Sequence, residues 1–179
     1  LFRSLRGGHE RRPDLVIYLN GLAIGVIELK RSSVDVADGI NQLITNQEEI
    51  FNLEFFTTVQ LVLAGSDSQG LRYGTATTRA EFFVEWKAGA LKPEPAEPNT
   101  QREMPADYQA LPGAEAVKSG YLLDGPLAQM CEKSRLLDLI RNFIIFDAGI
   151  KKVPRPHQYA AVKAAQERVR RKEGGVIWH

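Results

Sequence analysis

The spacing of apolar and polar residues changes several times along the chain, and each change predicts a new element. From Asp14 to Lys30, two apolar runs flank Asn20-Gly21, a dipeptide that is the strongest short-range signal of a β-hairpin. Apolar residues occupy both faces of these two strands, so we expect both faces of the sheet to be covered. This pattern favours an α/β fold over a one-sided antiparallel sheet.

After the hairpin the apolar spacing becomes helical, and it returns to a strand pattern near Phe55. The spacing predicts a helix from Ser33 to about Phe51, with Ser33 or Asp35 as its N-cap. The next segments predict, in order, a strand (FFTTVQLVLAG), a turn (GSDSQG), a partner strand (LRYGTATT) and a short strand or loop (EFFVEWK). Together these elements predict one α/β domain over residues 1–87.

Composition divides the rest of the chain into three parts. Residues 88–118 are rich in proline and lack apolar periodicity, which indicates a linker. Helical spacing resumes within residues 119–150, which we interpret as a helical connector. Residues 151–179 predict a further helix from about His157 to Lys172 and the start of a strand in GGVIWH, a pattern typical of the opening of a second α/β unit.

The overall composition excludes few functions. The net charge of +1 gives no global argument for nucleic-acid binding. No apolar run approaches the ~20 residues that span a bilayer, and no signal peptide opens the chain. The single cysteine, Cys131, has no intramolecular partner, so we expect a reducing, cytoplasmic location and no membrane partner. The chain starts at Leu1 and ends within an apolar run, so we expect a piece of a longer protein.

Three charged residues stand at the far end of the predicted hairpin, although buried strands rarely carry charges that are neither paired nor bound to a metal. Glu28 and Lys30 are two apart on one strand and therefore point to the same face. A plain two-residue loop at Asn20-Gly21 would put Asp14 on the opposite face from Glu28. A three-residue loop or a β-bulge near the turn would instead bring all three side chains together.

If they converge, these side chains match the needs of phosphodiester hydrolysis. Mg²⁺ takes oxygen ligands, usually one or two carboxylates completed by water and substrate. The ion polarises the phosphate and lowers the pKa of its bound water, and a neighbouring lysine orients that water or helps to deprotonate it. The alternative is a charged sheet edge that discourages aggregation. From these residues alone, both interpretations stay open.

The segments RPDLVIYLNG and VIELK resemble the nuclease motif of the R subunit of type I restriction-modification enzymes, a PD-(D/E)xK nuclease. The resemblance continues in the same order through DGINQLITNQEEIF, GTATTRAEFFVEWK, LLDLIRNFIIFD and KKVPRPHQYAAVKA to GGVIWH. It implies an N-terminally incomplete nuclease over residues 1–87, with a central mixed sheet flanked by helices. It also implies that Asp14 and Glu28 hold Mg²⁺ and that Lys30 helps to activate water.

The nucleases of this family carry a Gln-x-x-x-Tyr motif on the following helix, which this chain matches in part. Gln42 fits the first position, so the resemblance gives it a catalytic role in positioning DNA or Lys30. The fifth position holds Asn46, which lies one turn further along the helix and can hydrogen-bond but cannot stack.

The last segment resembles the start of a RecA-like helicase or translocase motor domain. In the family, GGVIWH precedes a Walker A loop that binds ATP phosphates, and this chain stops before that loop. Arg155 and Gln158, in RPHQY, resemble the glutamine motif that reads adenine. The resemblance therefore implies ATP as a second cofactor, used by the motor region beyond residue 179.

The resemblance also sets the expected reaction and partners. It implies that double-stranded DNA is cut after ATP-driven translocation, in a complex with methyltransferase and specificity subunits. Two other functions are weighed beside it. One is a non-catalytic DNA-binding or assembly module, which Asn46 and the weak net charge favour. The other is the nuclease domain of a different ATP-dependent helicase-nuclease. Intact Asp14, Glu28 and Lys30 favour the enzyme.

Overall fold

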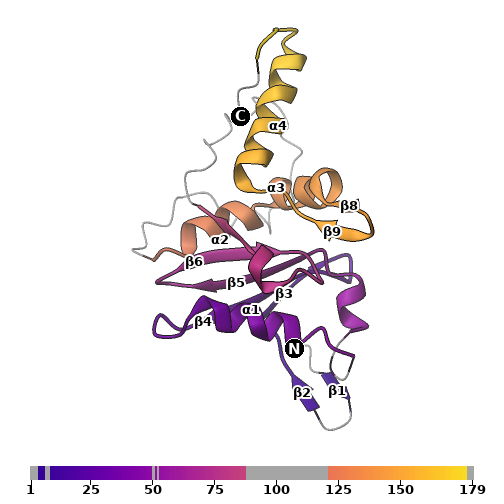
Figure 1. The fold of residues 1–179 in the computed structure, drawn as a ribbon, viewed down its shortest axis with the longest axis vertical. Helices are drawn as coiled ribbons and strands as arrows, with labels where there is room; N and C mark the ends of the chain where they lie inside the picture. The colour runs from indigo at the N-terminus through magenta and orange to yellow at the C-terminus, as the bar shows by residue number, and fades with distance from the viewer. Residues whose placement is uncertain (1–3, 7–8, 50, 52, 88–120, 177–179) are drawn as a thin grey trace, which may run out of the picture.

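A five-stranded sheet forms the centre of the computed structural model, which describes residues 4–6, 9–49, 51, 53–87 and 121–176 (Figure 1). In their order across the sheet, the strands are β3 (Leu15–Leu19), β4 (Leu22–Lys30), β5 (Leu61–Ser66), β6 (Gly70–Gly74) and β7 (Val84–Trp86). Strands β4 and β5 are parallel, whereas the other neighbouring pairs are antiparallel. The mixed sheet that the resemblance implies is therefore confirmed.

The other elements lie outside this sheet. Two antiparallel hairpins are β1 (Ser4–Arg6) with β2 (His9–Arg11), and β8 (Ile145–Asp147) with β9 (Ile150–Lys152). The helices are α1 (Val36–Thr45), α2 (Asp124–Cys131), α3 (Lys133–Asp138) and α4 (Pro156–Arg170). Short turns are the 3₁₀ turns η1 (Phe55–Thr57) and η2 (Ala80–Phe82) and the π-helical turn η4 (Leu139–Phe143).

The hairpin of β3 and β4 contains a β-bulge beside its turn. Asn20 and Gly21 form a two-residue turn with φ angles of 49° and 83°, the positive values that a type I′ turn requires. The register then shifts between Ile17 and Tyr18, because Ile24 is an extra residue on β4. The sequence predicts either a three-residue loop or a bulge at this place, and the structure confirms the bulge.

Helices cover both faces of the sheet, so the predicted α/β layering is also confirmed (Figure 1). On one face the core combines Ala23, Val26, Val62 and Ala64 of the sheet with Val36, Ile40 and Leu43 of α1. On the other face it combines Ile27, Leu61, Leu63, Leu71, Tyr73 and Trp86 with Leu123, Met130, Leu136, Leu139 and Tyr159. The second face is therefore covered by residues that follow the segment 88–120.

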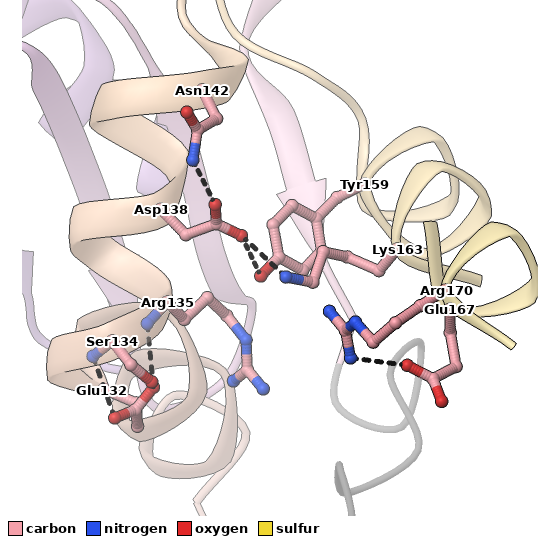
Figure 2. A network of polar contacts seen from close by, with 9 residues as sticks. All are labelled: Glu132, Ser134, Arg135, Asp138, Asn142, Tyr159, Lys163, Glu167 and Arg170. Carbon is pink, nitrogen blue, oxygen red and sulfur yellow. Dashed lines mark hydrogen bonds and ion pairs between the residues drawn. The ribbon is translucent and has the colours of Figure 1, made fainter. Parts of the chain in front are cut away.

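Polar contacts join α3 and η4 to α4, as Figure 2 shows. The Asp138 carboxylate accepts hydrogen bonds from the Asn142 amide at 2.7 Å and from the Tyr159 hydroxyl at 3.0 Å. The Lys163 ammonium lies 3.3 Å from the same carboxylate. Partial burial acts to raise the pKa of Asp138, but these three donors outweigh it and hold the pKa below its ordinary value. The first half of α4 is thus tied to the helices that cover the sheet.

Strand β9 and the segment that follows it also contact the sheet and the residues beside its strands. The Tyr73 hydroxyl donates to the Pro154 carbonyl at 2.6 Å, and the Thr75 hydroxyl donates to the Lys151 carbonyl at 3.1 Å. The Lys151 ammonium donates to the Val59 carbonyl at 3.2 Å, and burial lowers the pKa of this lysine. The domain boundaries at residues 87, 118 and 150 stay predictions. The helices of the predicted connector pack on the second face of the sheet.

The helix predicted from Ser33 to Phe51 is shorter in the structure. It begins after Asp35, whose carboxylate accepts a hydrogen bond from a backbone N–H of the first turn at 2.8 Å. It ends at Thr45, where the Gln47 amide donates to the Leu43 carbonyl at 2.9 Å. This side chain satisfies a carbonyl that the next helical turn would otherwise use, so the chain leaves the helix here.

Several other predicted elements differ from those observed. The strand expected from Phe55 starts at Leu61, because a 3₁₀ turn occupies 55–57. The helix expected in CEKSRLLDLIRNFIIFD divides into α3 and η4, and α2 and the β8–β9 hairpin were not predicted. The proline-rich linker and residues 177–179 lie outside the described residues, and residues 174–176 form no strand. In the described part, no helix has the length and apolar character needed to cross a membrane.

Candidate active site

The bulge decides which charged side chains meet at the far end of the hairpin. Leu15 faces Ile27, so the next residues outward, Asp14 and Glu28, face each other. Without the extra residue Ile24, an unshifted two-residue hairpin would turn Glu28 to the other face. The structure therefore brings together the two carboxylates that the sequence predicts as metal ligands.

Hydrogen bonds hold each of the four predicted site residues in place. The Asp14 Oδ2 atom accepts from the Leu29 backbone N–H at 2.8 Å. The Lys30 Nζ atom lies 2.9 Å from Glu28 Oε1 and 2.6 Å from Gln42 Oε1. The lysine thus bridges a strand carboxylate and a helix amide, and the predicted contact between Lys30 and Gln42 is present.

Glu28 is the most unusual ionisable group of this cluster because it is 1% exposed. Burial raises its pKa, and both the negative charge of Asp14 and a side-chain hydrogen bond with Asp14 act in the same direction. The hydrogen bond and the positive charge of Lys30 lower the pKa but do not cancel the rise. Its second oxygen, Oε2, is buried and has no hydrogen-bond partner among the described residues. A carboxylate oxygen in this state is a strong acceptor without a donor.

These carboxylates fit a hard divalent cation. A cation beside Oε2 of Glu28 would supply the positive charge that this buried oxygen lacks, and Asp14 lies on the same face. Mg²⁺ commonly uses only one or two protein carboxylates and keeps several waters. No cluster of three or more His, Cys, Asp or Glu side chains suited to a metal occurs in the described part of the chain.

The turn between β5 and β6 holds the start of α1, a role that the sequence pattern did not reveal. The Gln69 Oε1 atom accepts from the Val36 backbone N–H at 2.7 Å, and the Ser68 hydroxyl donates to the Ser32 carbonyl at 2.9 Å. These bonds fix the loop that connects Lys30 to the helix carrying its partner. The sequence signal was only that of a turn, and nothing local indicated where its side chains would reach.

Asn46, which replaces the family tyrosine, does not join the cluster. Its side chain is 0% exposed, and neither amide atom has a hydrogen-bond partner among the described residues. Its side chain could hydrogen-bond in place of the tyrosine, but it makes no such bond among the described residues. It caps the end of α1 through its backbone N–H, which donates to the Gln42 carbonyl at 2.9 Å.

Arg155 and Gln158 lie on the side of the sheet away from the carboxylates. They lie at the start of α4, directly after Pro154. The Pro154 carbonyl accepts a hydrogen bond from Tyr73, which packs in the core on the other face of the sheet. The Gln158 Oε1 atom accepts from the Arg155 backbone N–H at 2.9 Å, which is one of the two hydrogen bonds of a capping box. In this structure the glutamine side chain stabilises the start of a helix, and its predicted role in adenine binding stays a prediction.

Comparisons with known proteins show which sequences this chain is similar to. Residues 2–82 match the family model described as "Type I restriction enzyme R protein N terminus". The chain is 30% identical over 193 aligned positions to the type I restriction enzyme HindI endonuclease subunit of Haemophilus influenzae, covering 99% of this chain and 16% of that protein. It is 26% identical to the type I restriction enzyme EcoprrI endonuclease subunit of Escherichia coli, covering 88% and 44%.

The match of the family model includes all four residues of the cluster, since Asp14, Glu28, Lys30 and Gln42 lie within residues 2–82. The alignment with the HindI subunit extends over nearly the whole chain, although the chain spans only about a sixth of that relative's length. The resemblance found in the sequence is therefore confirmed: residues 2–82 match the N-terminal region of type I restriction enzyme R proteins, and the similar proteins are endonuclease subunits of such enzymes.

Proposed function

We propose that this region is a Mg²⁺-dependent endonuclease that cuts double-stranded DNA. The observation that carries the proposal is the buried Glu28 carboxylate, which faces Asp14, is paired with Lys30 on one oxygen and lacks a donor on the other. A purely structural ion pair would gain nothing from leaving that oxygen unsatisfied. In a metal-dependent reaction this oxygen would hold the ion, which would polarise the phosphate.

Each residue of the cluster then has a distinct task. Asp14 and Glu28 hold Mg²⁺, which when bound polarises the phosphate and lowers the pKa of water. The Lys30 ammonium orients the attacking water and offsets charge on the phosphate. Gln42 holds that ammonium in place through its side-chain oxygen. Its amide N–H₂ group is a donor suited to a DNA phosphate.

The rest of the proposal concerns the longer protein. We place cutting after ATP-driven translocation by a motor region that begins near α4, with Arg155 and Gln158 contributing to adenine binding. Methyltransferase and specificity subunits would be the partners in a cytoplasmic complex. The names of the relatives, both endonuclease subunits of type I restriction enzymes, support the assignment to a restriction complex.

The decisive experiment compares wild type with Asp14→Ala in the full-length protein, assembled with its partner subunits and supplied with ATP and Mg²⁺. Supercoiled plasmid should be cut by the wild type and left intact by the variant, because one of the two proposed ion ligands is gone. ATP hydrolysis in the same tubes should continue, which shows that the variant is folded and assembled. Cutting by Asp14→Ala at the wild-type rate would refute the proposed function.

Gln42→Ala should slow cleavage about 10–100-fold without abolishing it, the usual loss when a residue that orients a catalytic group is removed. The reason is that Lys30 keeps its ion pair with Glu28 but loses the acceptor at 2.6 Å. Asn46→Ala should have less effect on cleavage, since its side chain makes no hydrogen bond to the cluster. Single-turnover cleavage rates measure both, and equal rates for wild type and Gln42→Ala would show that Gln42 has no role in the reaction.

A further inference from the structure

Gly39 lies where the side chain of Lys30 passes under α1. Gly39 is buried and is three residues before Gln42, so the two share one face of the helix. A Cβ atom built at Gly39 would stand 3.3 Å from Lys30 Cγ and 3.6 Å from Lys30 Cε. It would also stand 3.3 Å from the Cβ atom of Ala64 on β5. The aliphatic part of the lysine therefore occupies the space beside the missing side chain.

The backbone gives no reason for a glycine at this position. Gly39 is not among the residues with positive φ, and it lies inside the ten-residue helix α1. In a helix interior, glycine is the least favourable residue apart from proline. The chain thus has an unfavourable residue where alanine would have the right conformation, and the space taken by Lys30 and by the methyl group of Ala64 explains it.

We propose that Gly39 is a positioning residue for Lys30, and this inference rests on the proposed function. The absent side chain leaves the passage through which the lysine reaches Glu28 and Gln42 together. The Lys30 side chain is only 17% exposed, so it has little freedom to take another path if a methyl group enters. A larger residue at position 39 displaces the ammonium without touching either carboxylate.

The test uses Gly39→Ala in the full-length protein with its partner subunits. We expect the cleavage rate at saturating DNA and Mg²⁺ to fall about tenfold, at the low end of the range for positioning residues. The DNA concentration for half-maximal rate should not change, because Gly39 contacts no DNA in this proposal. Thermal melting should change little, because the helix preference of alanine offsets the cost of the close contacts with Lys30 and Ala64. Ala37→Val is the matched control, since it adds bulk on an exposed position of the same helix and should cut normally.

A second variant separates a displaced lysine from a displaced helix. Gly39→Ala combined with Ala64→Gly moves one methyl group from the strand to the helix, which removes the 3.3 Å contact with Ala64 and keeps the contact with Lys30. If the lysine is the cause, the double variant stays slow; full recovery of the rate would overturn the inference. A wild-type rate for Gly39→Ala alone would overturn it too. Asp14→Ala in parallel tests the proposed function separately, because that variant should be inactive whatever Gly39 does.

Discussion

Replacing Glu28 or Lys30 by alanine is expected to abolish DNA cleavage in the assembled enzyme while ATP hydrolysis stays near the wild-type rate. Glu28→Ala removes the buried carboxylate that faces Asp14, so the proposed ion loses one of its two protein ligands. Lys30→Ala leaves both carboxylates but removes the ammonium 2.9 Å from Glu28. The measurement is plasmid cleavage and ATP hydrolysis by the same preparation.

The matched control for Glu28→Ala is Glu85→Ala on the same sheet. Glu85 also forms an ion pair, with Arg72 at 3.0 Å, but its side chain is 44% exposed, and exposed pairs contribute little to stability. This variant should cut DNA normally. If Glu28→Ala and Lys30→Ala removed ATP hydrolysis as completely as cleavage, the variants would be unfolded or the two activities would share these residues.

Mg²⁺ is expected to raise the melting temperature of the 179-residue chain, and Glu28→Gln is expected to remove that effect. At an ion concentration 100 times Kd, binding to the native state adds about 2.7 kcal/mol, which for a chain of this size is a rise of about 5–10 °C. The amide of Gln is a much weaker ligand for the ion than the carboxylate of Glu28. Thermal scans with and without Mg²⁺ measure the difference.

Without metal, the same variant should be more stable than wild type at neutral pH. Burial raises the pKa of Glu28 above its ordinary value of 4.5, so the unfolded chain loses this proton first as pH rises. The stability that the neutral carboxyl contributes is fully present below pH 4.5 and is lost as the pH rises through the raised pKa. Glu28→Gln keeps a neutral group throughout. Equal Mg²⁺-dependent shifts for both proteins would contradict the metal site, whatever the metal-free result.

The hairpin shows how far sequence reasoning reached the site. Asn20-Gly21 predicts the turn, and the need for Asp14 and Glu28 to share a face predicts an irregularity beside it. Which irregularity occurs depends on the packing of Ile24 into the core, and periodicity does not contain that information. The spacing of Glu28 and Lys30 on one strand predicted that their side chains share a face. The contact between Gly39 and Lys30 could not be predicted, because it depends on how α1 packs on the sheet.

The elements after residue 120 were less predictable because they are short and bury only a few residues each against the sheet. Helix α2 has eight residues and only Pro126 and Met130 buried, so its own sequence carries almost no helical pattern. The β8–β9 hairpin exposes Ile145, Phe146 and Ile150, although apolar residues in a pattern usually indicate a buried face. Helix α1 was predicted, but its end was not. The helix ends where the Gln47 side chain hydrogen-bonds to the Leu43 carbonyl, and the spacing of apolar residues does not indicate such a bond.

Residues before position 88 and residues after position 120 form one hydrophobic core together. This affects how the protein tolerates a change in the length of the segment between them. Leu63 and Tyr73 of the sheet pack with Met130 and Leu139 of the helices, so side-chain contacts join the two stretches independently of the residues between them. Each doubling of a connecting segment's length costs only about 0.6 kcal/mol. An inserted domain or reporter between Lys87 and Tyr121 should therefore disturb the active-site cluster little. The hydrogen bonds of Asp14, Glu28, Lys30 and Gln42 all join residues that precede this segment.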